Sequence, residues 1–334
     1  MPWPAGPPAG SPMPSGRPCG TRVPVAWPWR VAARPARRTG AACPTVDRNV
    51  SSLAVHREGE MLLFDCGEGT QRQMMRYGVG FSFKDIFFTH YHSDHFLGVI
   101  GLCRTMGLMD RKEGVTLYGP RGAQRILSAA LGIGIERTKF PVEIIEVKPG
   151  DRLGRGDYEI AVFETEHRAD TVGYALVEHD RLGRFDPERA RGLGIPEGPL
   201  WGEIHKGKTV SLPDGRTVSP AELVGPPRPA RTVVLSGDTR PHPAVLTAAR
   251  GADLLVHEAT FGQDERGRAL ETGHSTAREA AIIAREAGVL RLVLTHVSAR
   301  YSREAPELLA EAQEIFPDTM VARDGLTVEV PFRN

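Results

Sequence analysis

The stretch Ile86-Phe87-Phe88-Thr89-His90-Tyr91-His92-Ser93-Asp94-His95 carries the strongest signal in the chain. A short apolar run, typical of a buried strand, leads directly into a segment rich in histidine. Along a strand, His90 and His92 can point to one side, and the turn that follows directs Asp94 and His95 to a neighbouring position. Imidazole and carboxylate groups are ligands of zinc, so this pattern favours a site for two metal ions over a set of surface or capping histidines.

Several other apolar runs also end in a residue suited to metal chemistry. These residues are Asp65, His167, Asp238, Glu258 and His296. Because ligands gather at the carboxyl ends of strands in α/β proteins, we expect these side chains to converge on one edge of the fold. Taken singly, His167, Asp238 and His296 would each more often be a cap or a turn residue, and only their shared placement makes them predicted ligands. We expect the neighbouring His257 to be structural.

The chain from Val46 onward alternates short apolar runs with helical patterns, which predicts an α/β fold with a large sheet or two sheets. The predicted strands are 61–65, 85–90, 115–118, 142–147, 158–165, 172–177, 231–236, 253–257, 291–296 and 326–330. The predicted helices are 70–77, 96–108, 122–131, 276–287 and 303–315. The clearest helix start is the capping box of Thr276 and Glu279, and Gly288 is the expected stop.

Length and composition describe one large globular domain with an insertion or a tail. The chain has 334 residues, 40% hydrophobic residues and a net charge of +1. A nucleic-acid partner would therefore need a local patch or a site, because the whole molecule has no basic field. The four cysteines show no CxxC spacing and favour a reducing, cytoplasmic location, and no apolar run is long enough to span a membrane.

Two segments depart from the alternating pattern. Residues 1–44 contain eleven prolines, six arginines and no acidic residue, so we predict a disordered leader. A dispensable extension, or one foreign to the native chain, is favoured over a basic tail that contacts RNA. The folded part, 45–334, then carries about −5. Residues 179–230 are rich in glycine and proline and predict a partly ordered excursion from the core, with a functional role favoured over a tolerated insertion.

The motifs together resemble a known family. The pattern His90-x-His92-x-Asp94-His95 resembles the signature of the metallo-β-lactamase superfamily, whose fold is an αββα sandwich of two mixed sheets flanked by helices. Four further stretches resemble ribonuclease Z in its short form, the endonuclease that removes the 3′ trailer from precursor tRNA. They are Asp65–Gln73, Gly237–Thr239, His257–Thr260, and Gly273–Thr276 with Leu294–His296.

This resemblance implies roles for specific residues. His90, His92 and His167 would hold one zinc ion, Asp94, His95 and His296 a second, and Asp238 would bridge the two. A flexible tRNA-binding arm is implied at about 179–208, and a loop near the cleavage site at Pro44–Asn49. The implied substrate-binding residues are Arg48, Asn49, Gly194, Pro196, Gly198, Pro199, Lys206 and Lys208. The family is usually a homodimer, and its first strand, expected just before Gly40, has no strand pattern here.

Cleavage of a phosphodiester also needs a proton for the leaving oxygen. We predict that His274, placed before a helix and supported by Glu258, supplies that proton, and that Asp94 orients the attacking water besides binding metal. The alternative for His274 is a helix-entry residue. For the whole chain, the alternatives are another hydrolase of the superfamily, such as a phosphodiesterase or an arylsulfatase-like enzyme, and a non-catalytic RNA-binding protein.

Overall fold

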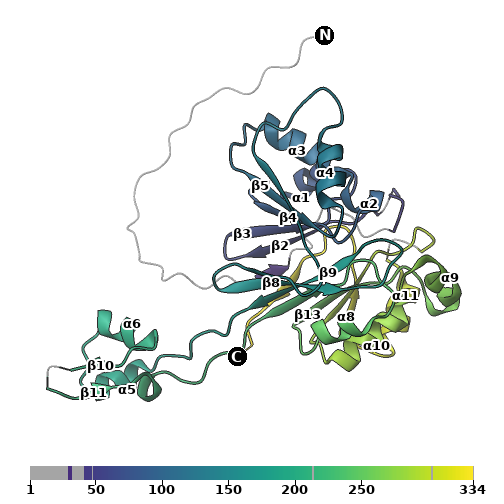
Figure 1. Cartoon of the computed structure of the whole chain (residues 1–334). Helices are drawn as coiled ribbons and strands as arrows, with labels where there is room; N and C mark the ends of the chain where they lie inside the picture. Colours follow the sequence, from purple (N-terminus) through teal and green to yellow (C-terminus); the bar gives the residue numbers. More distant parts are fainter. Residues whose placement is uncertain (1–28, 32–40, 47, 213, 302–303, 334) are drawn as a thin grey trace, which may run out of the picture.

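The computed structural model describes residues 29–31, 41–46, 48–212, 214–301 and 304–333. Figure 1 shows two layers of strands between two layers of helices, with one lobe projecting from the body. Among the described residues, no helix is both long and apolar enough to cross a membrane. The predicted α/β sandwich of two mixed sheets is confirmed.

The first sheet has the strand order β16-β1-β2-β3-β4-β5-β6. Its strands are β1 (Trp29–Val31), β2 (Leu53–Arg57), β3 (Glu60–Phe64), β4 (Asp85–Phe87), β5 (Val115–Gly119), β6 (Val142–Glu146) and β16 (Val328–Val330). Strands β3 to β6 run parallel, whereas β16, β1, β2 and β3 pair antiparallel. The sheet is therefore mixed, and the carboxyl ends of its parallel strands share one edge.

The second sheet has the order β15-β14-β13-β12-β9-β8-β7. Its strands are β7 (Arg152–Gly154), β8 (Tyr158–Glu164), β9 (Val172–Glu178), β12 (Thr232–Leu235), β13 (Leu254–Glu258), β14 (Leu292–Thr295) and β15 (Thr319–Val321). Strands β12 to β15 are parallel, and β9 is antiparallel to β12 and to β8. Strands β8, β12, β13 and β14 therefore all end at the same edge.

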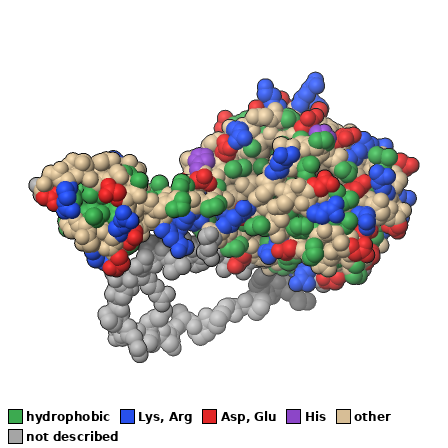
Figure 2. Space-filling view, turned by 90° about the horizontal axis from the view of Figure 1, so that it is seen from below, with side chains coloured by type: hydrophobic (Ala, Val, Ile, Leu, Met, Phe, Trp, Pro, Cys, Tyr) green, Lys and Arg blue, Asp and Glu red, His purple; other side chains and the backbone are tan. Residues whose placement is uncertain are grey.

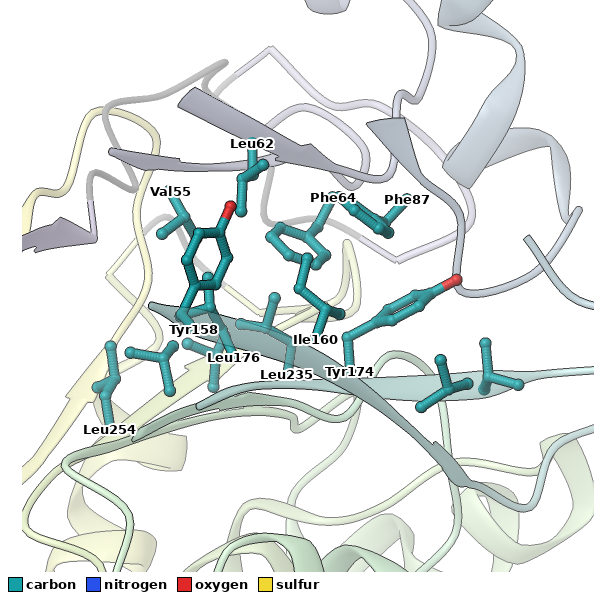
Figure 3. Close-up of a cluster of buried hydrophobic side chains, with 14 of the residues drawn as sticks. Val55, Leu62, Phe64, Phe87, Tyr158, Ile160, Tyr174, Leu176, Leu235 and Leu254 are labelled. Atoms are coloured by element: carbon teal, nitrogen blue, oxygen red, sulfur yellow. The ribbon is translucent and has the colours of Figure 1, made fainter. Parts of the chain in front are cut away.

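The main core lies between the two sheets. Along strand β8 the side chains alternate between the two faces of the second sheet. Tyr158, Ile160 and Val162 are buried in the core between the sheets, while Ala161 and Phe163 pack against the helices on the outer face. In Figure 3 Phe64 and Phe87 of the first sheet face the second sheet. Tyr174 of β9 donates from its hydroxyl to the Phe88 carbonyl at 2.7 Å, which ties the two sheets together.

Helices cover both outer faces. The first sheet is covered by α1 (Thr70–Tyr77), α3 (Gly98–Leu108) and α4 (Ala123–Leu131). The second is covered by α8 (Pro243–Ala248), α10 (Ala277–Ala287) and α11 (Pro306–Gln313). The predicted capping box of Thr276 and Glu279 starts α10, and Gly288 ends it at φ 65°. The short elements α2 (Ser93–Phe96), η1 (Gln263–Glu265) and α9 (Arg266–Thr272) lie in connections at the strand ends.

The excursion predicted at 179–230 forms a folded arm, which we define as residues 181–228. It contains α5 (Pro187–Gly192), α6 (Pro199–His205), β10 (Val210–Ser211), β11 (Thr217–Val218) and α7 (Pro220–Leu223). Buried side chains such as Ile195, Ile204 and Leu223 give it an apolar core of its own. The expectation of partial order is therefore wrong for its described residues, and the lobe continues past residue 208, because β10, β11 and α7 complete that core.

The prediction that residues 1–44 contain no strand is wrong at Trp29–Val31. This segment forms β1, with register pairs Trp29 to Val330 on one side and Arg30 to His56 on the other. Three residues are too few for a periodic pattern, and the hydrogen bonds come from neighbours distant in sequence. The first sheet therefore has a strand upstream of Gly40, at Trp29–Val31. The segment 32–40, where the family's first strand is expected, lies outside the described residues, as do residues 1–28.

Candidate metal centre

Seven predicted ligands meet at one edge of the sandwich, at the carboxyl ends of strands from both sheets. His90 and His92 follow β4, and Asp94 and His95 lie in the adjoining α2. The others come from the second sheet, where His167 follows β8, Asp238 follows β12 and His296 follows β14. The fold therefore brings together residues that are up to about two hundred positions apart in the chain.

The first group consists of His90, His92, His167 and Asp238. Nδ1 of His92 lies 3.0 Å from Nε2 of His90 and 3.1 Å from Nε2 of His167. Asp238 Oδ2 lies 3.7 Å from Nε2 of His90 and 4.0 Å from Nε2 of His167. Four donors around zinc at about 2.0–2.1 Å are separated by about 3.3 Å, so these spacings suit one ion.

The second group consists of Asp94, His95 and His296, joined by the same Oδ2 of Asp238. Nε2 of His95 and Nε2 of His296 are 3.3 Å apart. Asp94 Oδ2 lies 3.5 Å from Nε2 of His95 and 3.3 Å from Nε2 of His296. Asp238 Oδ2 lies 3.3 Å from Nε2 of His95 and 3.2 Å from Nε2 of His296. These spacings match the edges of a tetrahedron around one zinc ion. Asp238 is placed to bridge the two groups.

The second ring nitrogen of four of these histidines has a partner that fixes the ring. Nδ1 of His95 donates to Asp65 Oδ2 at 2.8 Å, and Nδ1 of His167 donates to the Gly273 carbonyl at 2.7 Å. Nδ1 of His90 lies 3.0 Å from the Thr89 hydroxyl, and Nδ1 of His296 lies 2.9 Å from the Thr260 hydroxyl. A proton on Nδ1 leaves Nε2 with a free lone pair, which is the form that binds a metal.

Burial and charge prepare the two groups differently. Burial lowers the pKa of His92 and His167, and lowers that of His90 well below its usual value, so these rings are neutral at pH 7 and can act as ligands. Burial also opposes a charge on His95, but the carboxylates of Asp238 and Asp65 outweigh it and raise its pKa well above the usual value. These carboxylates therefore favour a positive charge at Nε2 of His95, which a bound metal ion would supply in place of the proton.

The backbone around the centre is tightly constrained. Asp65 and His296 adopt positive φ values of 54° and 57°, which are uncommon for residues with a side chain. A Cβ atom at Gly98 would lie 1.8 Å from the carbonyl oxygen of Gly67, and one at Gly67 would lie 2.2 Å from the carbonyl oxygen of Asp94. Glycine at both positions allows the loop after β3 to pack directly against α2.

The predicted pair His274 and Glu258 lies beside this centre. Nδ1 of His274 is 2.7 Å from Oε1 of Glu258, which is fully buried and also accepts hydrogen bonds from Thr239 and Thr260. Burial disfavours a charge on His274, but the Glu258 carboxylate raises its pKa to about 9. The His274 ring stacks on that of His296 at 5.2 Å and keeps 13% of its side chain exposed.

The predicted substrate-binding residues lie in two separate places. The segment just before the loop at 44–49 reaches the centre, where the backbone N–H of Ala42 donates to Asp94 Oδ2 at 2.8 Å. Arg48, however, is only 2% exposed and donates from Nη1 to the Ala322 carbonyl, so its side chain anchors the loop and does not face solvent. Asn49 is partly exposed. The arm residues are all exposed and lie away from the centre: Gly194, Pro196, Gly198, Pro199, Lys206 and Lys208.

Asp65 and several residues without a sequence signal support the centre without being ligands. Asp65 was expected among the strand-end residues suited to metal chemistry, but it lies behind His95 and does not join either donor group. Thr89, Thr260 and the Gly273 carbonyl hold histidine rings in place. Short polar side chains and backbone carbonyls give no signal in a single sequence, so only the structure reveals them. His257 is fully buried and bonds the Glu258 carbonyl through Nδ1.

The fold belongs to the metallo-β-lactamase class. The chain superposes on the metallo-β-lactamase fold protein YhfI from Bacillus subtilis with a TM-score of 0.63 at 19% identity, covering 88% of this chain and 97% of that one. It superposes on the short form of human tRNase Z with a TM-score of 0.62 at 24% identity, covering 89% and 98%. At such identities these similarities establish the fold alone.

Sequence similarity defines the family. A family model described as anti-Pycsar protein Apyc1 matches residues 39–183, less than half of the chain. Ribonuclease Z from Gemmatimonas aurantiaca is 57% identical over 294 residues, which cover 87% of this chain and 94% of that protein. The chain belongs to the ribonuclease Z family.

Proposed function

We propose that this chain is an endonuclease that removes the 3′ trailer from precursor tRNA and leaves a 3′-hydroxyl on the tRNA. The proposal rests on one observation above all, which is that a chain of this family brings seven His and Asp side chains into two donor groups sharing Asp238. We assign His90, His92 and His167 to one zinc ion and Asp94, His95 and His296 to the other, with Asp238 between them.

Two bound zinc ions supply positive charge for the phosphoryl oxygens and lower the pKa of a water nucleophile. The chain's own groups keep this centre in order. Asp65 and the Gly273 carbonyl hold His95 and His167 in the correct tautomer. Asp94 receives the Ala42 amide on its Oδ2, so that its orientation is fixed before any substrate arrives. We further assign Asp94 to orienting the attacking water.

The leaving 3′ oxygen of the trailer bond needs a proton, which we assign to His274. Its Nδ1 is held by Glu258, and the ring lies among the donor side chains, since one ring nitrogen is within 4.8 Å of ligand atoms of Asp238 and His296. Glu258 is a positioning residue in this scheme because it is fully buried and bonded to the Thr239 and Thr260 backbone amides.

The arm is assigned to gripping the tRNA at a distance from the cleaved bond. The arm follows the end of β9 and precedes the start of β12, whereas His167 precedes β9 and Asp238 follows β12. The arm and the metal centre are therefore at opposite edges of the second sheet, and Figure 1 shows the arm pointing away from α2. Lys206 and Lys208 are exposed and offer cations to phosphate groups, although Lys208 pairs with Glu203 in this structure.

This geometry supports a homodimer in which the arm of one subunit serves the centre of the other. The test mixes two inactive variants, one with residues 184–224 replaced by a short glycine linker and one with His90→Ala. Co-refolded variants recover cleavage only if an arm can act across subunits, and light scattering gives the mass of each species. Failure to recover any activity in a mixed dimer contradicts the arrangement.

A substrate panel tests the activity against the alternatives. The zinc-loaded chain and its Asp94→Ala variant are incubated with precursor tRNA, mature tRNA, a small phosphodiester and an aryl sulfate. The proposal predicts that the wild type cleaves the precursor at least tenfold more efficiently than any small ester, while Asp94→Ala cleaves none. Efficient turnover of small esters without precursor cleavage favours another hydrolase, and tight tRNA binding without cleavage favours an RNA-binding protein.

A further inference from the structure

The base of the arm is joined to the body by a narrow neck, which we define as residues 179–184 and 225–231 and which includes the first and last residues of the arm. The two segments form an antiparallel ribbon, in which the amides of Arg181 and Arg228 donate to each other's carbonyls at 3.0 and 2.9 Å. They approach closely at Gly183, where a Cβ atom would lie 1.8 Å from the Gly225 carbonyl oxygen. Figure 2 shows the arm as a separate lobe on this neck. A two-stranded ribbon is weak alone, so contacts at its base set the direction of the arm.

An aromatic ring lies at the base of the neck. Phe332, which follows β16, has its ring centroid 3.5 Å from Cζ of Arg181 and 3.5 Å from Cζ of Arg231. Two guanidinium groups cannot share one ring face at that distance, so Phe332 is sandwiched between them. Nε and Nη2 of Arg181 are buried and have no hydrogen-bond partner among the described residues, so these two nitrogens make no hydrogen bond that would draw the guanidinium away from the ring.

Arg231, on the other face of the Phe332 ring, is fixed to the body. Arg231 is fully buried and donates from Nε and Nη2 to Glu178 at 2.8 Å each, and from Nη1 to the Val330 carbonyl at 3.2 Å. Glu178 also accepts from Arg57 of the first sheet. The segment that carries Phe332 is held in turn by Arg333, which donates to Asp253 at 2.7 Å. The ring therefore has a rigid seat, and Arg181 is the member that belongs to the arm.

We propose that Phe332 is a positioning residue for substrate recognition, which links Arg181 to Arg231 through the two faces of its ring and so fixes the direction in which the arm meets its tRNA. The inference deepens the proposed function and rests on it, because the arm must grip tRNA for its direction to matter. Among the described residues, the ring contacts of Phe332 are with Arg181 and Arg231, neither of which is a metal ligand or a predicted substrate-binding residue. Loss of Phe332 therefore weakens recognition of a large substrate and leaves the chemical step intact.

The test compares Phe332→Leu, which keeps an apolar side chain but has no ring face, with Phe332→Tyr, which keeps the face. Phe316→Leu is the matched control, because Phe316 is also partly buried but packs on the helices behind the second sheet. We expect Phe332→Leu to raise the KM for precursor tRNA about tenfold. Its kcat and its hydrolysis of bis(p-nitrophenyl) phosphate should stay at the wild-type level, as should the KM values of the other two variants.

Hydrogen exchange at the neck gives a second readout that does not depend on tRNA. We expect the amides of Arg181 and Arg228 to exchange about tenfold faster in Phe332→Leu, and amides of α10 to be unchanged. An unchanged KM or unchanged neck exchange in Phe332→Leu overturns the inference. If the wild type does not cleave precursor tRNA, the proposed function and the role in recognition both fail, and the exchange rates still decide whether Phe332 clamps the neck.

Discussion

Asp65 offers a sharp test of how the second metal group is held, because it orients a ligand without being one. Its Oδ1 accepts from the Thr89 amide at 2.8 Å, and its Oδ2 accepts from Nδ1 of His95 at 2.8 Å. In Asp65→Asn the amide oxygen keeps the Thr89 contact, so the NH2 group faces His95. Nδ1 of His95 must then accept a hydrogen bond, which places the ring proton on Nε2 and blocks the lone pair that would bind metal.

The expected loss follows from this change of tautomer. Removing an outer partner of a metal-bound histidine typically weakens metal affinity about 10- to 100-fold, or about 1.4–2.7 kcal/mol. We expect Asp65→Asn to bind one zinc ion with wild-type affinity, at His90, His92 and His167. The second zinc ion, at Asp94, His95 and His296, should bind about 10- to 100-fold more weakly. Competition titrations with a chromogenic chelator measure both affinities, and precursor cleavage should fall in parallel with occupancy of the weaker site.

Asp85→Asn is the matched control for this experiment. Asp85 lies in β4, is 6% exposed like Asp65, and pairs with Arg155 at 3.0 Å. It makes no contact with either donor group, so its substitution should lower the melting temperature without changing zinc affinity. The reasoning is refuted if Asp65→Asn binds both zinc ions as tightly as the wild type, or if Asp85→Asn weakens the second ion equally.

Three further predictions concern the site and its frame. His274→Ala should lower kcat for precursor cleavage about 10²- to 10⁴-fold with zinc content retained, and an unchanged kcat would assign His274 to helix entry alone. Gly98→Ala should destabilise the fold by about 1–3 kcal/mol in thermal unfolding, because its Cβ meets the Gly67 carbonyl, whereas Gly267→Ala, with open space around it, should not. Removal of metal with a chelator should abolish cleavage and lower the melting temperature, and added zinc should restore both. An unchanged melting temperature of the metal-free chain would contradict the idea that metal binding stabilises the fold.

The elements that sequence patterns predict well are the long periodic ones. Helix α1 occupies the predicted residues 70–77, and β8 (Tyr158–Glu164) lies within the strand predicted at 158–165. Strands β1, β2, β7 and β15 were not predicted, because their pairing depends on partners distant in sequence. The three-residue strands β4 and β16 were predicted only as parts of longer apolar runs. The helices and strands of the arm were not predicted, because its core is built from single apolar residues that are scattered along the sequence, such as Ile195 and Leu223.

The metal centre could be located from the sequence because its ligands follow strands. His90, His92, Asp94 and His95 stand together, and the shared strand-end placement of His167, Asp238 and His296 linked them before their distances were known. The hydrogen bonds that orient those rings could not be predicted, since Thr89, Thr260 and the Gly273 carbonyl are ordinary groups until the fold brings them near. For Arg48 the sequence suggested a role that its position does not favour. It was expected to bind substrate, but its side chain is buried and anchors the loop.

The most direct test of the central claim is to map the 3′ end of the product made by the zinc-analysed chain from a 5′-labelled precursor tRNA. The account predicts about two zinc ions per chain, cleavage at the junction of the tRNA body and its trailer, and a product end that poly(A) polymerase extends because it carries a 3′-hydroxyl. An uncut precursor with two zinc ions bound, or a product ending in a 3′-phosphate, would contradict it.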